Sequence, residues 1–170
     1  MKREITTLVF VVLVASAFVA PVLGENPNKA PVAAEILTGV YDLSSIISWK
    51  SEGGIVHLDY AHVWGTLTIY INGVETYSNV PYDDVISGNY NPNTMVGNWK
   101  YDEVWTLPGG TLVGTAIVTS YGGSLLNYRE LESKILLKGT GDFEGQILSM
   151  SHSYVKGIGH VVYEGYWLTP

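Results

Sequence analysis

The sequence contains no cysteine in its 170 residues. Without cysteine the chain has no disulfide framework, no thiolate nucleophile and no thiol to which a lipid can be attached. Any fold that it adopts outside the reducing cytosol is therefore held together by its packed core alone.

Positive charge is also scarce. The chain has 9 Lys and Arg residues against 16 Asp and Glu residues, a formal net charge of -7, and beyond the N-terminus the positive residues are scattered singly. Nucleic acids and anionic membrane surfaces bind proteins through clustered basic residues, so we expect neither as a partner. The acidic balance mainly favours solubility.

Long apolar runs are absent except at the N-terminus. Lys2 and Arg3 precede an apolar segment over residues 8–20, and Gly24 ends the short stretch that follows it. This order predicts a secretory signal peptide over residues 1–24, and the apolar segment is shorter than the roughly 20 residues that span a bilayer. An uncleaved membrane anchor is the alternative. After cleavage we expect no membrane span and a secreted protein, extracellular or in the cell envelope.

Composition divides the remaining chain into two parts. Residues 25–34 are mainly Pro, Asn and Ala and predict a flexible leader. Residues 35–170 show no linker and no internal repeat, so we predict one domain there, long enough to bury a core.

Helical periodicity is scarce as well. Short β-rich runs bounded by turn residues follow one another, and Asn72-Gly73 between two such runs is the strongest hairpin signal. About eight strands can be counted, which predicts an all-β fold, a single antiparallel β-barrel, with a β-sandwich as the alternative. Residues 78–98 hold two prolines and several asparagines with little periodicity, and predict a long loop of the kind that often has a function.

The most regular turn lies near the C-terminal end. Apolar residues at 135–137 and 147–150 flank Gly139-Thr140-Gly141-Asp142-Phe143-Glu144-Gly145. This pattern predicts a hairpin in which Gly141 has positive φ or presses against a neighbouring strand. The Gly-x-Gly-x-Phe-x-Gly stretch is similar to one in the allene oxide cyclase and dirigent-like β-barrels, where it also lies near the C-terminal end. The resemblance implies a β-barrel and leaves an isomerase or cyclase activity open, but no catalytic residue of the cyclases carries over.

Residues with acid–base or metal-binding chemistry are few. His57 and Asp59 share one face of an expected strand, and with His62 nearby they are candidates for a metal site or an acid–base pair. Their spacing matches no zinc pattern, and ordinary surface residues are the alternative. The acidic pair at residues 83–84, with the asparagines that follow, lacks the spacing of a calcium loop. We therefore predict no catalytic residue, no metal and no cofactor.

Aromatic residues are the abundant feature, with 5 Trp and 12 Tyr. Trp99, Tyr101 and Trp105 alternate along one expected strand, so their rings share one face beside the predicted loop. Trp and Tyr suit the lining of an apolar pocket or stacking on a sugar. We predict that these three residues bind a ligand; packing in the core is the alternative.

Together these features favour a non-catalytic secreted barrel that binds a small apolar molecule or has a role in the cell envelope. An isomerase or cyclase of the allene oxide cyclase type is one alternative, and a carbohydrate-binding module that binds a glycan is another. An enzyme needs acid–base groups that face the lumen, so the orientation of His57, Asp59 and Glu103 discriminates between the classes.

Cleavage after Gly24 leads to a testable prediction. N-terminal sequencing of protein recovered from the extracellular side should find Glu25 as the first residue. Met1 retained on protein in the membrane fraction would identify the uncleaved anchor instead.

Overall fold

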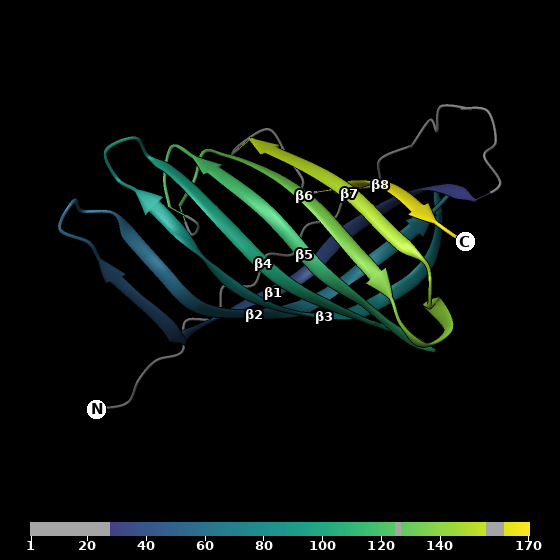
Figure 1. Ribbon diagram of the computed structural model, residues 1–170. Coiled ribbons are helices and arrows are strands. Elements are labelled where there is room, and N and C mark those ends of the chain that lie inside the picture. Colours follow the sequence, from purple (N-terminus) through teal and green to yellow (C-terminus); the bar gives the residue numbers. More distant parts are fainter. Residues whose placement is uncertain (1–27, 125–126, 156–161) are drawn as a thin grey trace.

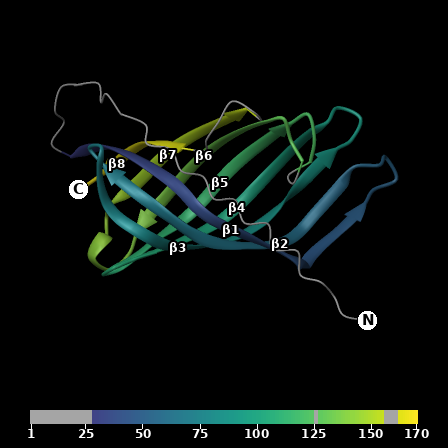
Figure 2. The same ribbon diagram turned by 180° about the vertical axis from the view of Figure 1, so that it is seen from behind.

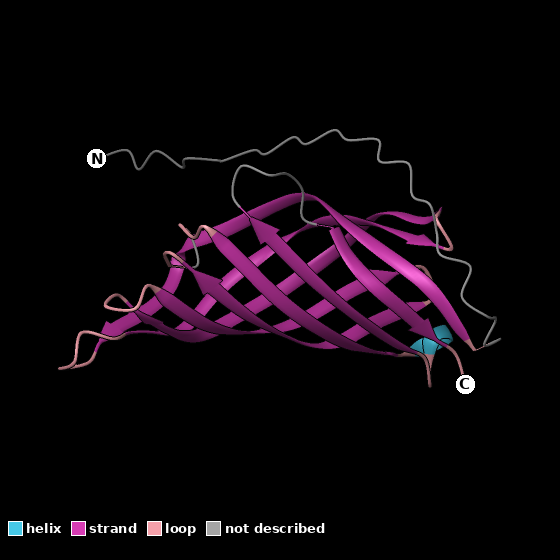
Figure 3. Ribbon diagram, turned by 90° about the horizontal axis from the view of Figure 1, so that it is seen from above, coloured by secondary structure: helices cyan, strands magenta, loops and turns pink. Residues whose placement is uncertain are grey.

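Eight antiparallel strands form a closed barrel in the computed structural model of the chain (Figure 1). The structure describes residues 28–124, 127–155 and 162–170, so the predicted signal peptide at residues 1–24 lies outside the described residues. The strands are β1 (Lys29–Lys50), β2 (Val56–Ile71), β3 (Val74–Asn91), β4 (Val96–Leu107), β5 (Gly110–Tyr121), β6 (Glu130–Gly139), β7 (Ile147–Val155) and β8 (Val162–Leu168). They cross the barrel obliquely (Figure 3), as closure requires. The predicted all-β barrel is confirmed, and the sandwich alternative is excluded.

The barrel closes between its first and last strands. Lys29 to Glu35 of β1 pair with Leu168 to Val162 of β8 (Figure 2), so residues 29–34 of the segment expected to be a flexible leader form part of the sheet. This pairing satisfies backbone N–H and C=O groups that would otherwise form two open sheet edges. In the described part of the chain, no helix has the length and apolar character needed to cross a membrane.

Residues 78–98 form strands rather than the predicted long loop. Most of them lie in β3 and β4, which are joined by a turn of only four residues. In β3, buried Val80, Tyr82 and Ile86 alternate with less buried neighbours. An irregularity in the β2–β3 register near Asn79, which has a φ of 52°, interrupts this period. The loop prediction was wrong because the prolines and asparagines were interpreted as loop residues although most of them lie within paired strands.

Two turns have the positive φ values that their sequences predict. In the β2–β3 turn, Asn72 and Gly73 have φ values of 53° and 76°, as the favoured two-residue hairpin requires. β6 and β7 are joined by the 3-10 helix η1 (Gly141–Phe143), where Gly141 has a φ of 63°. A Cβ atom on Gly141 would lie 2.5 Å from the carbonyl oxygen of Gly109 in the β4–β5 turn. Both the backbone conformation and the close approach of this turn therefore require glycine.

Aromatic side chains fill the end of the barrel that carries these turns. η1 buries Phe143, whose ring centroid is 5.8 Å from that of Trp167 and 6.1 Å from that of Tyr77. The Trp167 indole donates a hydrogen bond to the side chain of Gln146. We call Tyr77, Phe143 and Trp167 the aromatic plug. The polar site described below lies beyond this plug, toward the middle of the barrel.

The turn geometry predicts the effect of a larger residue at Gly141. Gly141→Val should lower the free energy of unfolding by about 1–3 kcal/mol through backbone strain and contact with Gly109. Gly53 is the control, because it is exposed and the nearest atom to an added Cβ is Ser51 Oγ at 3.9 Å. Thermal melts should show a lower midpoint for Gly141→Val and an almost unchanged one for Gly53→Val; equal midpoints would show that the turn tolerates side chains.

Candidate functional site in the barrel lumen

β4 directs alternate side chains into the barrel. Trp99, Glu103 and Trp105 are 5%, 5% and 2% exposed, and Tyr101 is partly buried on the same face. The aromatic residues predicted to share a face therefore do so, and that face lines the lumen. Trp99 Nε1 donates a hydrogen bond of 3.0 Å to Ser120 Oγ, which holds this ring in place. Contact of the three rings with a ligand stays a prediction.

Two carboxyl groups oppose each other across β3 and β4. Asp84 and Glu103 are register partners, so their Cβ atoms are about 5 Å apart on the inward face. Asp84 is 7% exposed, whereas every lysine and arginine in the described ranges is exposed. Asp84 Oδ1 and Glu103 Oε2 have no hydrogen-bond partner. Buried carboxyls without a cation and with unused oxygens oppose folding, and such groups are typical of functional sites.

Burial favours the neutral form of both carboxyls. It raises the pKa of Asp84 well above its usual range, and the negative charge of Glu103 raises that pKa further. Burial also raises the pKa of Glu103, although a hydrogen bond from the Trp105 indole opposes the shift. Near neutral pH the pair therefore retains protons, and the carboxyls can donate as well as accept hydrogen bonds.

Four tyrosine side chains from four strands surround the carboxyl pair. They are Tyr41 of β1, Tyr82 of β3, Tyr101 of β4 and Tyr163 of β8. Burial raises the pKa of all four, and the charge of Asp84 contributes to each shift. A hydrogen bond joins Tyr101 to Tyr41, and the Tyr82 hydroxyl donates one of 3.1 Å to the Thr38 carbonyl. We call these four tyrosines, with Asp84 and Glu103, the lumen cluster.

Tyr41 lies where the lumen cluster meets solvent. It keeps 40% of its accessible surface although burial raises its pKa. The lumen cluster therefore reaches solvent at the Tyr41 ring. A separate depression lies on the outer surface of β5 to β8; most of its lining residues are exposed, and the inward-facing Ser133 and His152 also border it.

Ser133 and His152 add polar groups beside the lumen cluster. They are register partners on β6 and β7, both are buried, and neither side chain has a hydrogen-bond partner. The His152 ring centroid is 4.9 Å from that of Tyr163. Burial lowers the pKa of His152 to about 4, so its imidazole is neutral near neutral pH. The lumen therefore combines unused hydrogen-bond donors and acceptors with little net charge.

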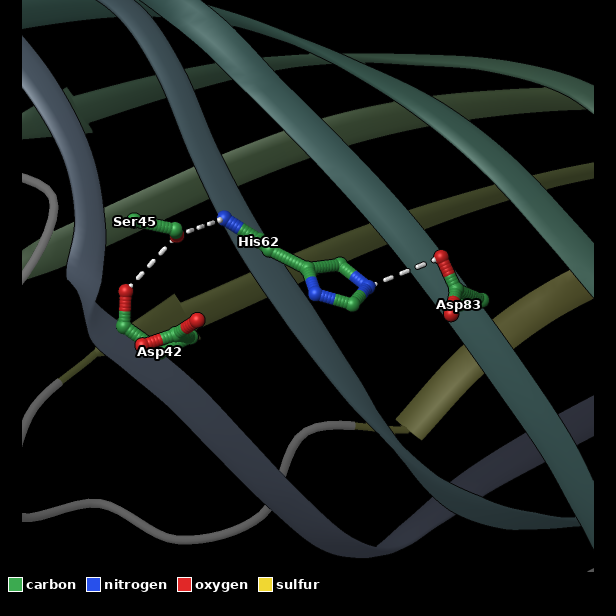
Figure 4. A network of polar contacts seen from close by, with 4 residues as sticks. All are labelled: Asp42, Ser45, His62 and Asp83. Carbon is green, nitrogen blue, oxygen red and sulfur yellow. Dashed lines mark hydrogen bonds and ion pairs between the residues drawn. The ribbon is translucent and has the colours of Figure 1, made fainter.

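The histidine and aspartate candidates of β2 do not converge on one site. His57 stacks on Trp49 with a centroid distance of 3.9 Å, and the Trp49 indole donates a hydrogen bond to Asp59. His62 instead contacts Asp83, with 3.0 Å between Nε2 and Oδ1 (Figure 4). Among the described residues, no group of three or more potential ligands can hold a metal ion.

Asp83 and Asp84 point to opposite faces of β3. Asp83 is exposed and pairs with His62, whose side chain is 28% exposed, whereas Asp84 is buried. The alternation of strand residues therefore prevents the two carboxyls from sharing a calcium ion. Figure 4 shows that the outer pair belongs to a small network, in which the His62 N–H donates to Ser45 Oγ and Ser45 donates to the Asp42 carbonyl. An ion pair this exposed contributes little to stability.

Sequence interpretation misses most of the lumen cluster. Of the residues chosen to discriminate an enzyme from a binding protein, Glu103 is buried on the inward face, whereas Asp59 is exposed. Asp84 and Tyr82 lay within the predicted loop, and no motif marks His152. One signal was present: once β3 is recognised as a strand, Asp84 stands on its apolar face between Tyr82 and Ile86, where a carboxylate is unusual.

Comparison with known proteins leaves the fold as the established result. No family model, curated protein or solved structure matches the chain. The chain is an eight-stranded antiparallel β-barrel, and no comparison identifies it with the allene oxide cyclase and dirigent-like proteins.

The raised pKa values predict that stability falls as the pH rises. Asp84 and Glu103 retain protons in the folded state that the unfolded chain has already lost. The stabilisation that these protons provide is therefore complete below the pKa values of the two carboxyls in the unfolded chain. It falls as the pH rises and is lost once the pH has passed their pKa values in the folded state. The lowered pKa of His152 makes stability rise with pH instead, but only below about pH 6.5, where the imidazole of the unfolded chain becomes protonated.

Neutral replacements test this pH dependence. Asp84→Asn or Glu103→Gln should flatten the fall in Tm above pH 6.5 and raise Tm at pH 8 by about 2–8 °C. The outward-facing neighbour gives the control, because Asp83 makes the smallest of the three contributions to the raised pKa of Asp84. Asp83→Asn removes the same charge from outside the barrel and should leave most of the slope in place. A wild-type Tm that does not fall between about pH 6.5 and pH 9 would show that the lumen carboxyls ionise normally.

Proposed function

We propose that the protein binds a small, mainly apolar molecule in the barrel lumen without changing it chemically. The proposal is carried by buried polar atoms that lack partners inside an aromatic lumen: Asp84 Oδ1, Glu103 Oε2, Ser133 Oγ and both ring nitrogens of His152. Such atoms destabilise the fold unless a partner satisfies them. A ligand with an apolar body and a few polar groups would supply those partners while filling the space between the rings.

The residues predicted from sequence have a place in this proposal. Tyr101 belongs to the lumen cluster, and Trp105 donates a hydrogen bond to Glu103, so a ligand at the carboxyl pair would lie beside both. Trp99 extends the aromatic lining on the same face. The inward direction of these rings favours a ligand enclosed by the lumen over a glycan that stacks on the outer surface.

An isomerase or cyclase is the second candidate. It is favoured by the presence, in one lumen, of protonated carboxyls and a neutral imidazole, whose pKa values are shifted in opposite directions. Such groups are matched to the roles of general acid and general base near neutral pH. The glycine motif and the barrel architecture would agree with a relationship to the allene oxide cyclase and dirigent-like proteins.

The proposed setting is extracytoplasmic. Residues 1–24 have the pattern of a signal peptide, and the chain needs no disulfide because the aromatic plug and the closed sheet supply its packing. A secreted barrel of this kind would carry or retain its ligand outside the cell or within the cell envelope.

Tryptophan fluorescence tests lumen binding. Wild-type protein is titrated with a panel of lipids, apolar dyes and oligosaccharides, and a lumen ligand should shift the emission. Trp99→Phe and Trp105→Phe should each remove part of this response, whereas Trp49→Phe should retain it because Trp49 is 50% exposed and stacks on His57. If no compound perturbs the spectrum while both inner variants lose substantial stability, the rings are core and the proposal fails.

The fate of the bound ligand separates the two candidates. NMR of a compound recovered after incubation should show it unchanged if the protein only binds it. Conversion by the wild type that disappears in Glu103→Gln would support the isomerase or cyclase instead.

A further inference from the structure

We propose that the ligand of the lumen is an organic cation, an apolar molecule with a protonated amine that lies between Asp84 and Glu103 inside the four tyrosines of the lumen cluster. This inference rests on the proposed binding of a small molecule in the lumen and specifies the chemical class of that molecule. It follows from three features of the site: the opposed carboxyls, the absence of a basic partner and the surrounding aromatic rings.

The carboxyl pair lacks a positive partner within the described chain. Asp84 and Glu103 oppose each other across two paired strands, each has one oxygen without a hydrogen bond, and the described lysines and arginines are all exposed. A hydroxyl on a neutral ligand can satisfy one of these oxygens. Only a cation can also remove the repulsion between the two groups when they ionise, because its charge offsets theirs. The same pair would repel an anionic ligand.

The tyrosines suit an ammonium group better than a metal ion. Aromatic faces attract cations, most strongly in sites from which water is excluded, and cages of such rings recognise ammonium ligands. Tyr82 and Tyr101 flank the carboxyl pair along its own strands, β3 and β4, and Tyr41 and Tyr163 come from β1 and β8. A metal ion would need a larger set of oxygen or nitrogen ligands, and no group of three acidic or histidine ligands occurs among the described residues.

Binding of a cation would be linked to release of a proton. The carboxyl that pairs with the ammonium group loses its proton to solvent, so affinity should rise as higher pH removes that proton beforehand. The other groups that face the pair do not titrate in this range. Burial keeps Tyr41, Tyr82, Tyr101 and Tyr163 protonated and His152 neutral. On the outer face of β3, the charge of Asp83 also raises the pKa of Asp84.

Three probes with one carbon skeleton test the charge preference. Cyclohexylmethylamine, cyclohexylmethanol and cyclohexanecarboxylate are, respectively, positive, neutral and negative at pH 7–8, and none absorbs where tryptophan does. Dissociation constants are measured by tryptophan fluorescence and by ligand-observed NMR from pH 6 to pH 9. At pH 8 the amine should bind on the order of tenfold more tightly than the alcohol, with the carboxylate weakest. The affinity of the amine should rise with pH, and that of the alcohol should not.

Matched variants locate the preference. Asp84→Asn and Glu103→Gln should remove the charge preference, so that each variant binds the amine no more tightly than it binds the alcohol, and circular dichroism checks that each variant is folded. Asp83→Asn should keep the wild-type preference, because it removes a carboxylate of the same strand from the outer face. Retention of the preference in both inner variants would place the cation elsewhere and overturn the inference.

The outcomes distinguish this inference from the proposed function. If the alcohol binds as tightly as the amine, the lumen is a ligand site but the cation preference is wrong. If the amine does not bind at concentrations up to about 10 mM, the inference fails. If, in addition, no compound of the wider panel binds, lumen binding itself fails.

Discussion

Two carboxyl groups opposed across neighbouring strands, with no buried base to neutralise them, are the constraint on which the rest of the lumen depends. Burial raises the pKa of both groups, and the charge of Glu103 raises the pKa of Asp84 further, so burial favours the neutral forms. Their neighbours are accordingly phenols and an indole, which interact through hydrogen bonds and ring faces rather than through charge. A lysine or arginine pointing inward would remove the feature that makes this lumen chemically distinctive.

The residues that pack the end of the barrel and the residues of the candidate site lie in different parts of it. The aromatic plug closes the end with the tight turns and contains no carboxyl, imidazole or amine group, whereas the lumen cluster begins beyond it. Glycine on neighbouring strands shapes the boundary between the two parts. A Cβ atom on Gly65 or on Gly39 would lie within 2.8 Å of the Tyr82 side chain, so the bare backbone at these positions lets the ring of Tyr82 lie flat and reach the Thr38 carbonyl.

The architecture could be predicted from the sequence where local chemistry is strong. Asn72-Gly73 and Gly141 have few backbone conformations open to them, so their turns and the strands beside them were recognisable. The alternation of Trp99, Tyr101 and Trp105 correctly predicted that the three rings share one face, and the structure adds that this face is inward. The rest of the site depends on which strands become neighbours, and no local pattern shows that Asp84 will oppose Glu103 or that Tyr163 will approach His152. β3 was not recognised for a further reason, since an irregular register and the outward-facing Pro81 obscure its period of two.

The order of strand pairing has a consequence for how the chain folds. Seven of the eight ladders join strands that follow each other in sequence, but the last joins Lys29 to Leu168, so the final pairing spans almost the whole described chain. Contacts between distant segments carry a larger loop-closure cost and form slowly. During synthesis β1 is made before β8, so one edge of β1 stays unpaired until β8 is available. Open strand edges readily pair with other chains. By pairing with β1, β8 therefore covers the edge through which copies of the chain could associate.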